Sequence, residues 1–119
     1  IVCRAFHNGA NHPGKVVGTS CNIGWGGNEI VSPKFEVLLN EGQLPLQWVP
    51  YAGTVPKNAV LVGTDVGKSY YVGQFTRTDG SIHAGKVFGP PGKHIFNYGY
   101  GGKELTELKG FRILVQLGQ

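Results

Sequence analysis

The sequence contains little charge, no methionine and no long apolar run. Of its 119 residues, 15% are charged, whereas about 25% is typical of globular domains. No apolar stretch approaches the roughly 20 residues that a membrane-spanning helix needs, so no transmembrane segment is expected. Disorder is disfavoured, because 40% hydrophobic and 11% aromatic residues are sufficient to form a core.

The sequence has only two cysteines, Cys3 and Cys21, and their spacing matches no metal-ligand pattern. They are compatible with free core thiols or with a disulfide, and the sequence leaves both open. A disulfide would indicate an oxidising compartment. We expect a secreted location rather than a cytoplasmic one.

The net charge is +4, but the eleven cationic residues are spread almost evenly along the chain and no two are adjacent. A surface that follows phosphates needs several cations on one face. No nucleic-acid recognition motif is present in the sequence. We therefore expect no binding to DNA or RNA.

Residues 63–69, GTDVGKS, superficially resemble a phosphate-binding loop. That motif requires four residues between its glycines and a following helix. Here three residues intervene and a strand pattern follows, so we predict a hairpin turn. The sequence also lacks G-x-S-x-G and H-E-x-x-H motifs, and its four histidines are expected at the surface or in turns. These patterns predict neither an enzyme nor a metal or cofactor site.

Glycine, in contrast, is abundant, with 20 residues. Short runs of β-branched and aromatic residues lie between Gly, Pro, Asn or Asp, which is typical of strands. No window of a dozen residues has a helical periodicity free of Gly or Pro. The sequence predicts an all-β fold, sandwich-like or barrel-like, with strands that include residues 35–39, 58–62, 70–75 and 111–115.

An internal repeat organises the chain. Residues 12–16 match 83–87, residues 22–30 match 97–105, and residues 35–38 match 111–114. The first copy begins at Ile1, opposite Tyr71, so a front half comparable to residues 46–70 is expected to be missing from it. We expect a single domain over residues 1–119, with the back half of one repeat at 1–40 and a second repeat at 45–116.

Two Gly-Lys pairs recur in the copies, at Lys15 and Lys86, each with a histidine three residues earlier. Each lysine could point to solvent from a hairpin or hold a ligand, since an ammonium offers three donors. Together with a carboxylate it suits the hydroxyls of a neutral polyol. Asp65, in a Gly-flanked loop, is the candidate for this carboxylate. The alternative for Asp65 is a turn-forming role.

The glycine-rich blocks around Trp25 and Tyr100 also allow two interpretations. Their aromatic rings could stack on a sugar, but core packing is favoured. Glu29 and Glu104 could bind loop N–H groups or line a pocket.

At these residues the chain resembles the DM9 repeat, which occurs in natterin-like proteins and in a mannose-binding lectin of oysters. The resemblance covers essentially the whole chain and rests on Trp48, Val55-Pro56, Ala59-Val60, Gly63, Tyr71-Val72, Gly85-Lys86-Val87, Tyr100-Gly101-Gly102, Glu104, Phe111 and Leu114. It implies a compact β fold of two intertwined repeats about a pseudo-twofold axis.

The resemblance also implies metal-independent binding of mannose-type glycans in innate defence. In the lectin members, an Asp and the Lys of Gly-Lys-Val hold the sugar hydroxyls, and these roles map onto Asp65 and Lys86. Lys15 is then a half-site, because its acidic partner would fall before Ile1, and Glu104 is an additional candidate. A homodimer would raise avidity. The alternative is a protein-interaction or membrane-targeting module of a natterin-like protein without a monosaccharide site.

Overall fold

A computed structural model describes residues 1–39 and 45–117, and this part of the chain is all-β, as predicted. Its strands are β1 (Val2–His7), β2 (Ala10–Val17), β3 (Ser20–Trp25), β4 (Asn28–Ser32), β5 (Glu36–Val37), β6 (Leu46–Pro50), β7 (Leu61–Asp65), β8 (Lys68–Thr76), β9 (Ile82–Phe88), β10 (Ile95–Tyr100), β11 (Lys103–Glu107) and β12 (Arg112–Gln116). These residues contain no helix that could cross a membrane.

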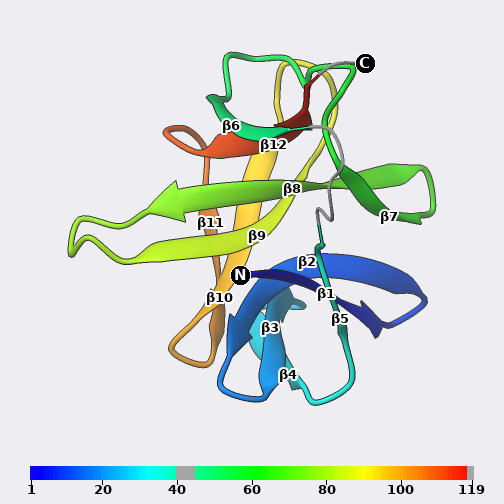
Figure 1. The fold of residues 1–119 in the computed structure, drawn as a ribbon, viewed down its shortest axis with the longest axis vertical. Coiled ribbons are helices and arrows are strands. Elements are labelled where there is room, and N and C mark those ends of the chain that lie inside the picture. Colours follow the sequence, from blue (N-terminus) through cyan, green and yellow to red (C-terminus); the bar gives the residue numbers. More distant parts are fainter. Residues whose placement is uncertain (40–44, 118–119) are drawn as a thin grey trace.

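The strands form one continuous antiparallel sheet that curls around its own core (Figure 1). Their order is β5-β1-β2-β3-β4-β11-β10-β9-β8-β12-β6, and β7 pairs separately with β8. The curl brings strands together that are distant in the sheet order, so that β2 packs against both β9 and β7. Side chains of β2 and β9 can therefore meet across the interior.

The two sequence copies have the same strand connectivity. In the first copy β1 to β4 form a meander and β5 returns to pair with β1, and in the second copy β8 to β11 form a meander and β12 returns to pair with β8. The copies meet where β4 pairs with β11, at Asn28 and Lys103. Strands β6 and β7 come from the segment that has no counterpart in the first copy.

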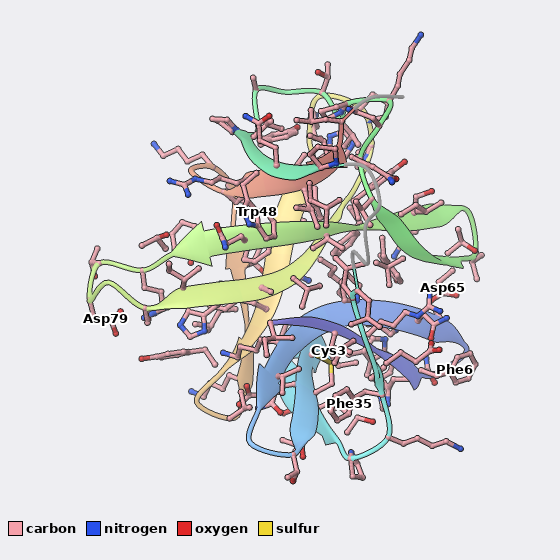
Figure 2. The ribbon with its side chains drawn as sticks, viewed as in Figure 1. Cys3, Phe6, Phe35, Trp48, Asp65 and Asp79 are labelled. Carbon is pink, nitrogen blue, oxygen red and sulfur yellow. A yellow bond between two sulfur atoms is a disulfide. The ribbon has the colours of Figure 1, made fainter. Side chains whose placement is uncertain are left out.

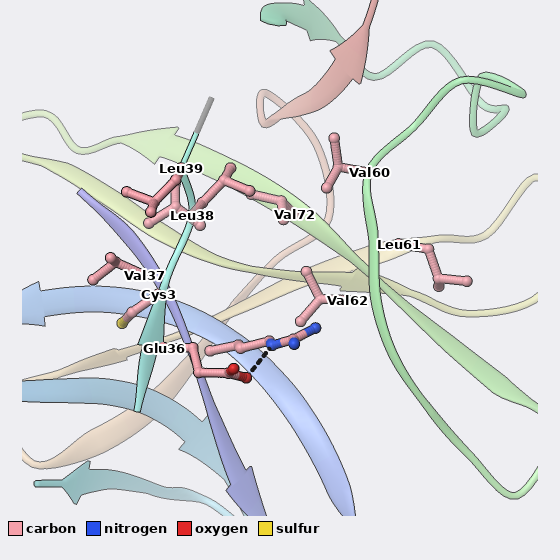
Figure 3. A pocket seen from close by; sticks show the side chains of 11 residues that line it. Cys3, Glu36, Val37, Leu38, Leu39, Val60, Leu61, Val62 and Val72 are labelled. Carbon is pink, nitrogen blue, oxygen red and sulfur yellow. Dashed lines mark hydrogen bonds and ion pairs between the residues drawn. The ribbon is translucent and has the colours of Figure 1, made fainter. Parts of the chain in front are cut away.

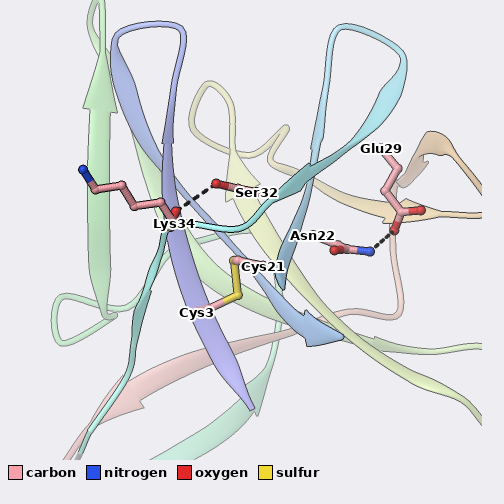
Figure 4. Close-up of a disulfide and its surroundings, with 6 residues drawn as sticks. All are labelled: Cys3, Cys21, Asn22, Glu29, Ser32 and Lys34. Carbon is pink, nitrogen blue, oxygen red and sulfur yellow. Dashed lines mark hydrogen bonds between the residues drawn. A yellow bond between two sulfur atoms is a disulfide. The ribbon is translucent and has the colours of Figure 1, made fainter. Parts of the chain in front are cut away.

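Each half of the sheet has its own buried cluster. The larger one contains Val87, Phe96, Tyr98, Phe111 and Ile113, and the smaller one contains Cys3, Ala5, Cys21 and Ile23. The two cysteines of the smaller cluster form a disulfide (Figure 4). It connects β1 to β3 across the intervening β2, which resolves the alternative that the sequence left open.

Two of the predicted strands are shorter than expected. The run at 35–39 forms only the two-residue strand β5, and the run at 58–62 enters a strand only at Leu61. Ala59 makes an isolated bridge to Val115, and the Asn58 side chain donates to the Gln116 carbonyl at 2.9 Å. Residues 58–60 are therefore held against β12 without forming a ladder. The hairpin expected at 63–69 is confirmed, with its turn between β7 and β8.

Candidate functional site

Lys86 lies in the middle of β9, and its side chain is only 3% exposed. Its Nζ donates to His12 Nδ1 of β2 at 3.0 Å, and it lies 4.9 Å from the centre of the Tyr70 ring and 5.6 Å from that of Phe88. Of the two roles considered for this lysine, pointing to solvent from a hairpin is therefore wrong. The curl of the sheet places it under two aromatic rings, where cation–π contacts replace part of its hydration.

Asp65 ends β7 at the tip of the β7–β8 hairpin, where Figure 2 labels it. Burial raises the pKa of Tyr70, and the nearby Asp65 charge raises it further. Lys86 contacts the same tyrosine ring, and the Asp65 charge also acts on the pKa of Lys86, so Asp65 and Lys86 both lie near Tyr70. Two residues 21 positions apart in the sequence are thus brought into one neighbourhood.

The turn that follows Asp65 has an unusual backbone. Val66 has a φ of 43° and a side chain that is 96% exposed. A β-branched residue is strained in this left-handed region. Strain of this kind concentrates at binding and switch sites, and here it lies directly beside the candidate acid.

The contact between Lys86 and His12 determines the tautomer of the imidazole. An ammonium can only donate, so Nδ1 of His12 accepts, and Nε2 donates to the His7 carbonyl at 3.1 Å. A second proton on the ring, at Nδ1, would point this N–H at the N–H groups of the Lys86 ammonium. Burial and the Lys86 charge accordingly lower the pKa of His12 to about 4, and burial lowers the pKa of Lys86 to about 8.

The other repeat copy contains the same pair with the partners exchanged. Lys15 of β2 donates to Nδ1 of His83 of β9, and Nε2 of His83 lies 2.8 Å from the Ser81 hydroxyl. Each lysine therefore bonds to the histidine of the other copy. The expectation of surface or turn histidines is wrong for His12 and His83, which are 0% and 8% exposed, because the repeat pattern does not reveal which strands face one another.

Glu29 and Glu104 bind loop N–H groups, which was one of the two roles expected for them. The Glu104 carboxylate accepts from Gly27 N at 3.0 Å and from Asn97 Nδ2 at 2.9 Å. Glu29 makes the equivalent bonds to Gly102 N at 3.0 Å and Asn22 Nδ2 at 3.2 Å. Glu104 also stabilises the Lys86 charge from a distance, so its connection to the candidate site is electrostatic.

Sequence reasoning missed Tyr70 and Phe88, which cover Lys86, and Arg77, whose guanidinium lies 4.1 Å from the centre of the Tyr100 ring. The first two belong to ordinary strand patterns and carry no signal of their own. Trp25 is half-buried against His7, with ring centres 5.0 Å apart, and Tyr100 packs at the edge of the larger core.

An apolar hollow of about 250 Å³ lies elsewhere, between β5 and the segment leading into β7 (Figure 3). Its lining includes Leu38, Val62 and Val72, with the Arg4–Glu36 ion pair at 2.8 Å on its rim. Neither Asp65 nor Lys86 lines it. Among the described residues, no three His, Cys, Asp or Glu side chains are grouped as metal ligands would be.

Comparison with protein families gives the DM9 repeat, whose model matches residues 1–107. The chain belongs to the DM9 repeat family. Comparison with curated proteins returned no match. The family is a group of binding modules, so membership suggests carbohydrate binding without specifying the sugar. The residues that the DM9 resemblance assigned to a ligand, Asp65 and Lys86, are neighbours in this fold.

Proposed function

We propose that the chain is a metal-independent lectin that binds mannose or mannose-rich glycans through Asp65 and Lys86, in innate recognition. The observation that supports this most is that both residues lie near Tyr70. A carboxylate only accepts and an ammonium only donates, and together they suit adjacent sugar hydroxyls. The Tyr70 and Phe88 rings supply apolar surface at the same place.

The burial of Lys86 sets a condition for this binding. Since the side chain is 3% exposed, a sugar hydroxyl reaches Nζ only when the ring of Tyr70 or Phe88 moves aside. The nitrogen uses one donor for His12, so its remaining donors are available. A single site of this kind binds weakly, because each bond to a hydroxyl replaces one to water. Assembly as a homodimer supplies avidity.

The same burial favours a second candidate, an interaction module whose pocket does not accept a sugar. Phe6 is 68% exposed and Val66 is 96% exposed. Phe6 and Asp65 lie at the same end of the molecule (Figure 2), where β7 packs so closely on β2 that a Cβ on Gly63 would lie 2.2 Å from the Asn11 carbonyl. Exposed apolar side chains on paired hairpins are suited to a protein or membrane partner.

Retention on mannose–agarose separates the two. The lectin is expected to be retained with and without EDTA, and Asp65→Asn and Lys86→Gln are expected to abolish retention, whereas Glu36→Gln on the exposed edge strand leaves it unchanged. Retention that EDTA removes would contradict the metal-independent mechanism. No retention of the wild-type chain, with capture of a protein or membrane partner, would favour the interaction module.

A further inference from the structure

Two cations meet at Tyr100, at the other end of the β8–β9 pair from Asp65. The Arg77 guanidinium carbon lies 4.1 Å from the centre of the Tyr100 ring, and Lys15 Nζ lies 5.7 Å from it. Burial lowers the pKa of Lys15 and the Arg77 charge lowers it further, whereas the Glu29 charge raises it. Burial and both cations lower the pKa of His83. The two cations thus lie close enough to repel each other.

The neighbouring carboxylates are already engaged with other groups. Asp79 Oδ1 accepts from the Ser81 backbone at 2.9 Å and from the Ser81 hydroxyl at 2.6 Å. Glu29 is bonded to Gly102 and Asn22, and Glu107 accepts from the Tyr98 hydroxyl at 2.9 Å. Among the described residues, neither Lys15 nor Arg77 forms an ion pair.

Arg77 also has a donor without an acceptor. Its Nη1 donates to the Tyr98 hydroxyl at 2.7 Å, but its Nε is buried and has no hydrogen-bond partner in the described part of the chain. A buried guanidinium donor that lacks a partner is unfavourable. An oxyanion bound beside the two cations would reduce the repulsion between Arg77 and Lys15.

An open cavity of about 530 Å³ borders this cluster on the side of Lys15 and His83 and provides space for a ligand, although Arg77 and Tyr100 do not line it. It is lined by Lys15, His83, Gln74 and Trp48, among others. The lining combines an indole ring, an amide and a cation, which are groups that bind sugars. The volume is ample for a monosaccharide ring.

We propose that Lys15 and Arg77 form a second site, which takes a sugar carrying a carboxylate or a sulfate. That the ligand is a sugar rests on the proposed function, whereas its negative charge rests on the two unpaired cations. This proposed site is distinct from that of Asp65 and Lys86, for which a neutral sugar is proposed.

The test compares methyl glucuronide with methyl glucoside, which differ only in the carboxylate, by titration calorimetry or chemical-shift perturbation. Glucose 6-sulfate tests whether the site accepts a sulfated sugar, and inorganic sulfate tests whether it accepts a simple anion. Methyl mannoside reports on the Lys86 site. Wild-type protein is expected to bind the glucuronide at least about tenfold more tightly than the glucoside. Lys15→Gln and Arg77→Gln should remove this preference and leave mannoside binding intact, and Lys34→Gln should change neither.

Salt dependence of the wild-type chain tests the same point without any change to folding. Raising the ionic strength should weaken glucuronide binding and spare mannoside binding. Equal affinity for glucuronide and glucoside, or an unchanged preference in both variants, would overturn the second site. If inorganic sulfate competes for the site as well as the acidic sugars do, the site binds anions only, and the proposal that its ligand is a sugar is overturned. If the wild-type chain binds the glucuronide but not the mannoside, the result counts against the proposed function and not against this second site.

Discussion

Glu29 and Glu104 each bind the glycine-rich turn of the other repeat copy, with Glu29 Oε1 3.0 Å from Gly102 N and Glu104 Oε1 3.0 Å from Gly27 N. The adjacent backbone bonds are also reciprocal, from Glu29 N to the Gly102 carbonyl and from Glu104 N to the Gly27 carbonyl. The two copies are therefore joined by side chains as well as by the β4–β11 ladder.

Replacing Glu104 with alanine removes the acceptor for Gly27 N and Asn97 Nδ2. We expect the free energy of unfolding in urea to fall by about 1–2 kcal/mol, because two donors lose their partner. Glu36→Ala removes only an exposed ion pair and should cost at most about 1 kcal/mol. Equal losses in the two variants would contradict a joining role for Glu104.

Gly99 leaves room for the Glu29 side chain to cross the strand. A Cβ at position 99 would lie 2.6 Å from Glu29 Cγ, so Gly99→Ala is expected to destabilise the fold by about 1–3 kcal/mol. Adding Glu29→Ala removes the obstructing atoms. The double variant should therefore lose less stability than the two single variants together, and strict additivity in urea unfolding would show that the close contact does not cause the loss.

Acid should destabilise the fold through His12. Its pKa is lowered to about 4 from 6.5, so between these values the unfolded chain binds a proton that the folded chain does not. Stability therefore falls as the pH decreases through this window, by up to about 3 kcal/mol. His12→Gln, which cannot be protonated, should flatten the profile between pH 6.5 and 4. A variant whose pH profile matches that of the wild type would assign the acid sensitivity to other groups.

Mannoside binding should weaken in mild alkali. Burial lowers the pKa of Lys86 from 10.5 to about 8, so the ammonium loses its charge and one donor as the pH rises from 7 to 9. Affinity for methyl mannoside, measured by titration at pH 7, 8 and 9, is expected to decline with a midpoint near 8. Binding that stays constant to pH 9 would remove Lys86 from the site.

Removing the disulfide should lower the free energy of unfolding while the β-sheet still forms. Cys3 and Cys21 are 18 positions apart, and a cross-link that closes a loop of about this length stabilises by about 3 kcal/mol through the entropy of the unfolded chain. We expect Cys3→Ala/Cys21→Ala to unfold at lower urea concentration while keeping its β circular dichroism spectrum. An unchanged midpoint would show that the bond contributes little.

Much of the fold was predictable because strand patterns and glycine-bounded turns are local. The runs at 70–75 and 111–115 lie in β8 and β12 almost as expected. The prediction of a strand at 58–62 was wrong in part. A segment with a strand-like sequence forms a ladder only where a partner strand offers a free edge. Asp65 and Lys86 were identified by resemblance, whereas their common neighbour Tyr70 depends on the curl of the sheet.

The sequence by itself determined the all-β class, the repeat, the DM9 resemblance and the residue types available for binding, because all of these are written in order along the chain. Only the tertiary structure decided that Lys15 bonds to His83 and Lys86 to His12, and that Cys3 bonds to Cys21. It also decided that Lys86 is buried and that Arg77 lies on Tyr100. Contacts of this kind join residues from separate strands, and they exist only once the sheet has curled and buried its apolar face.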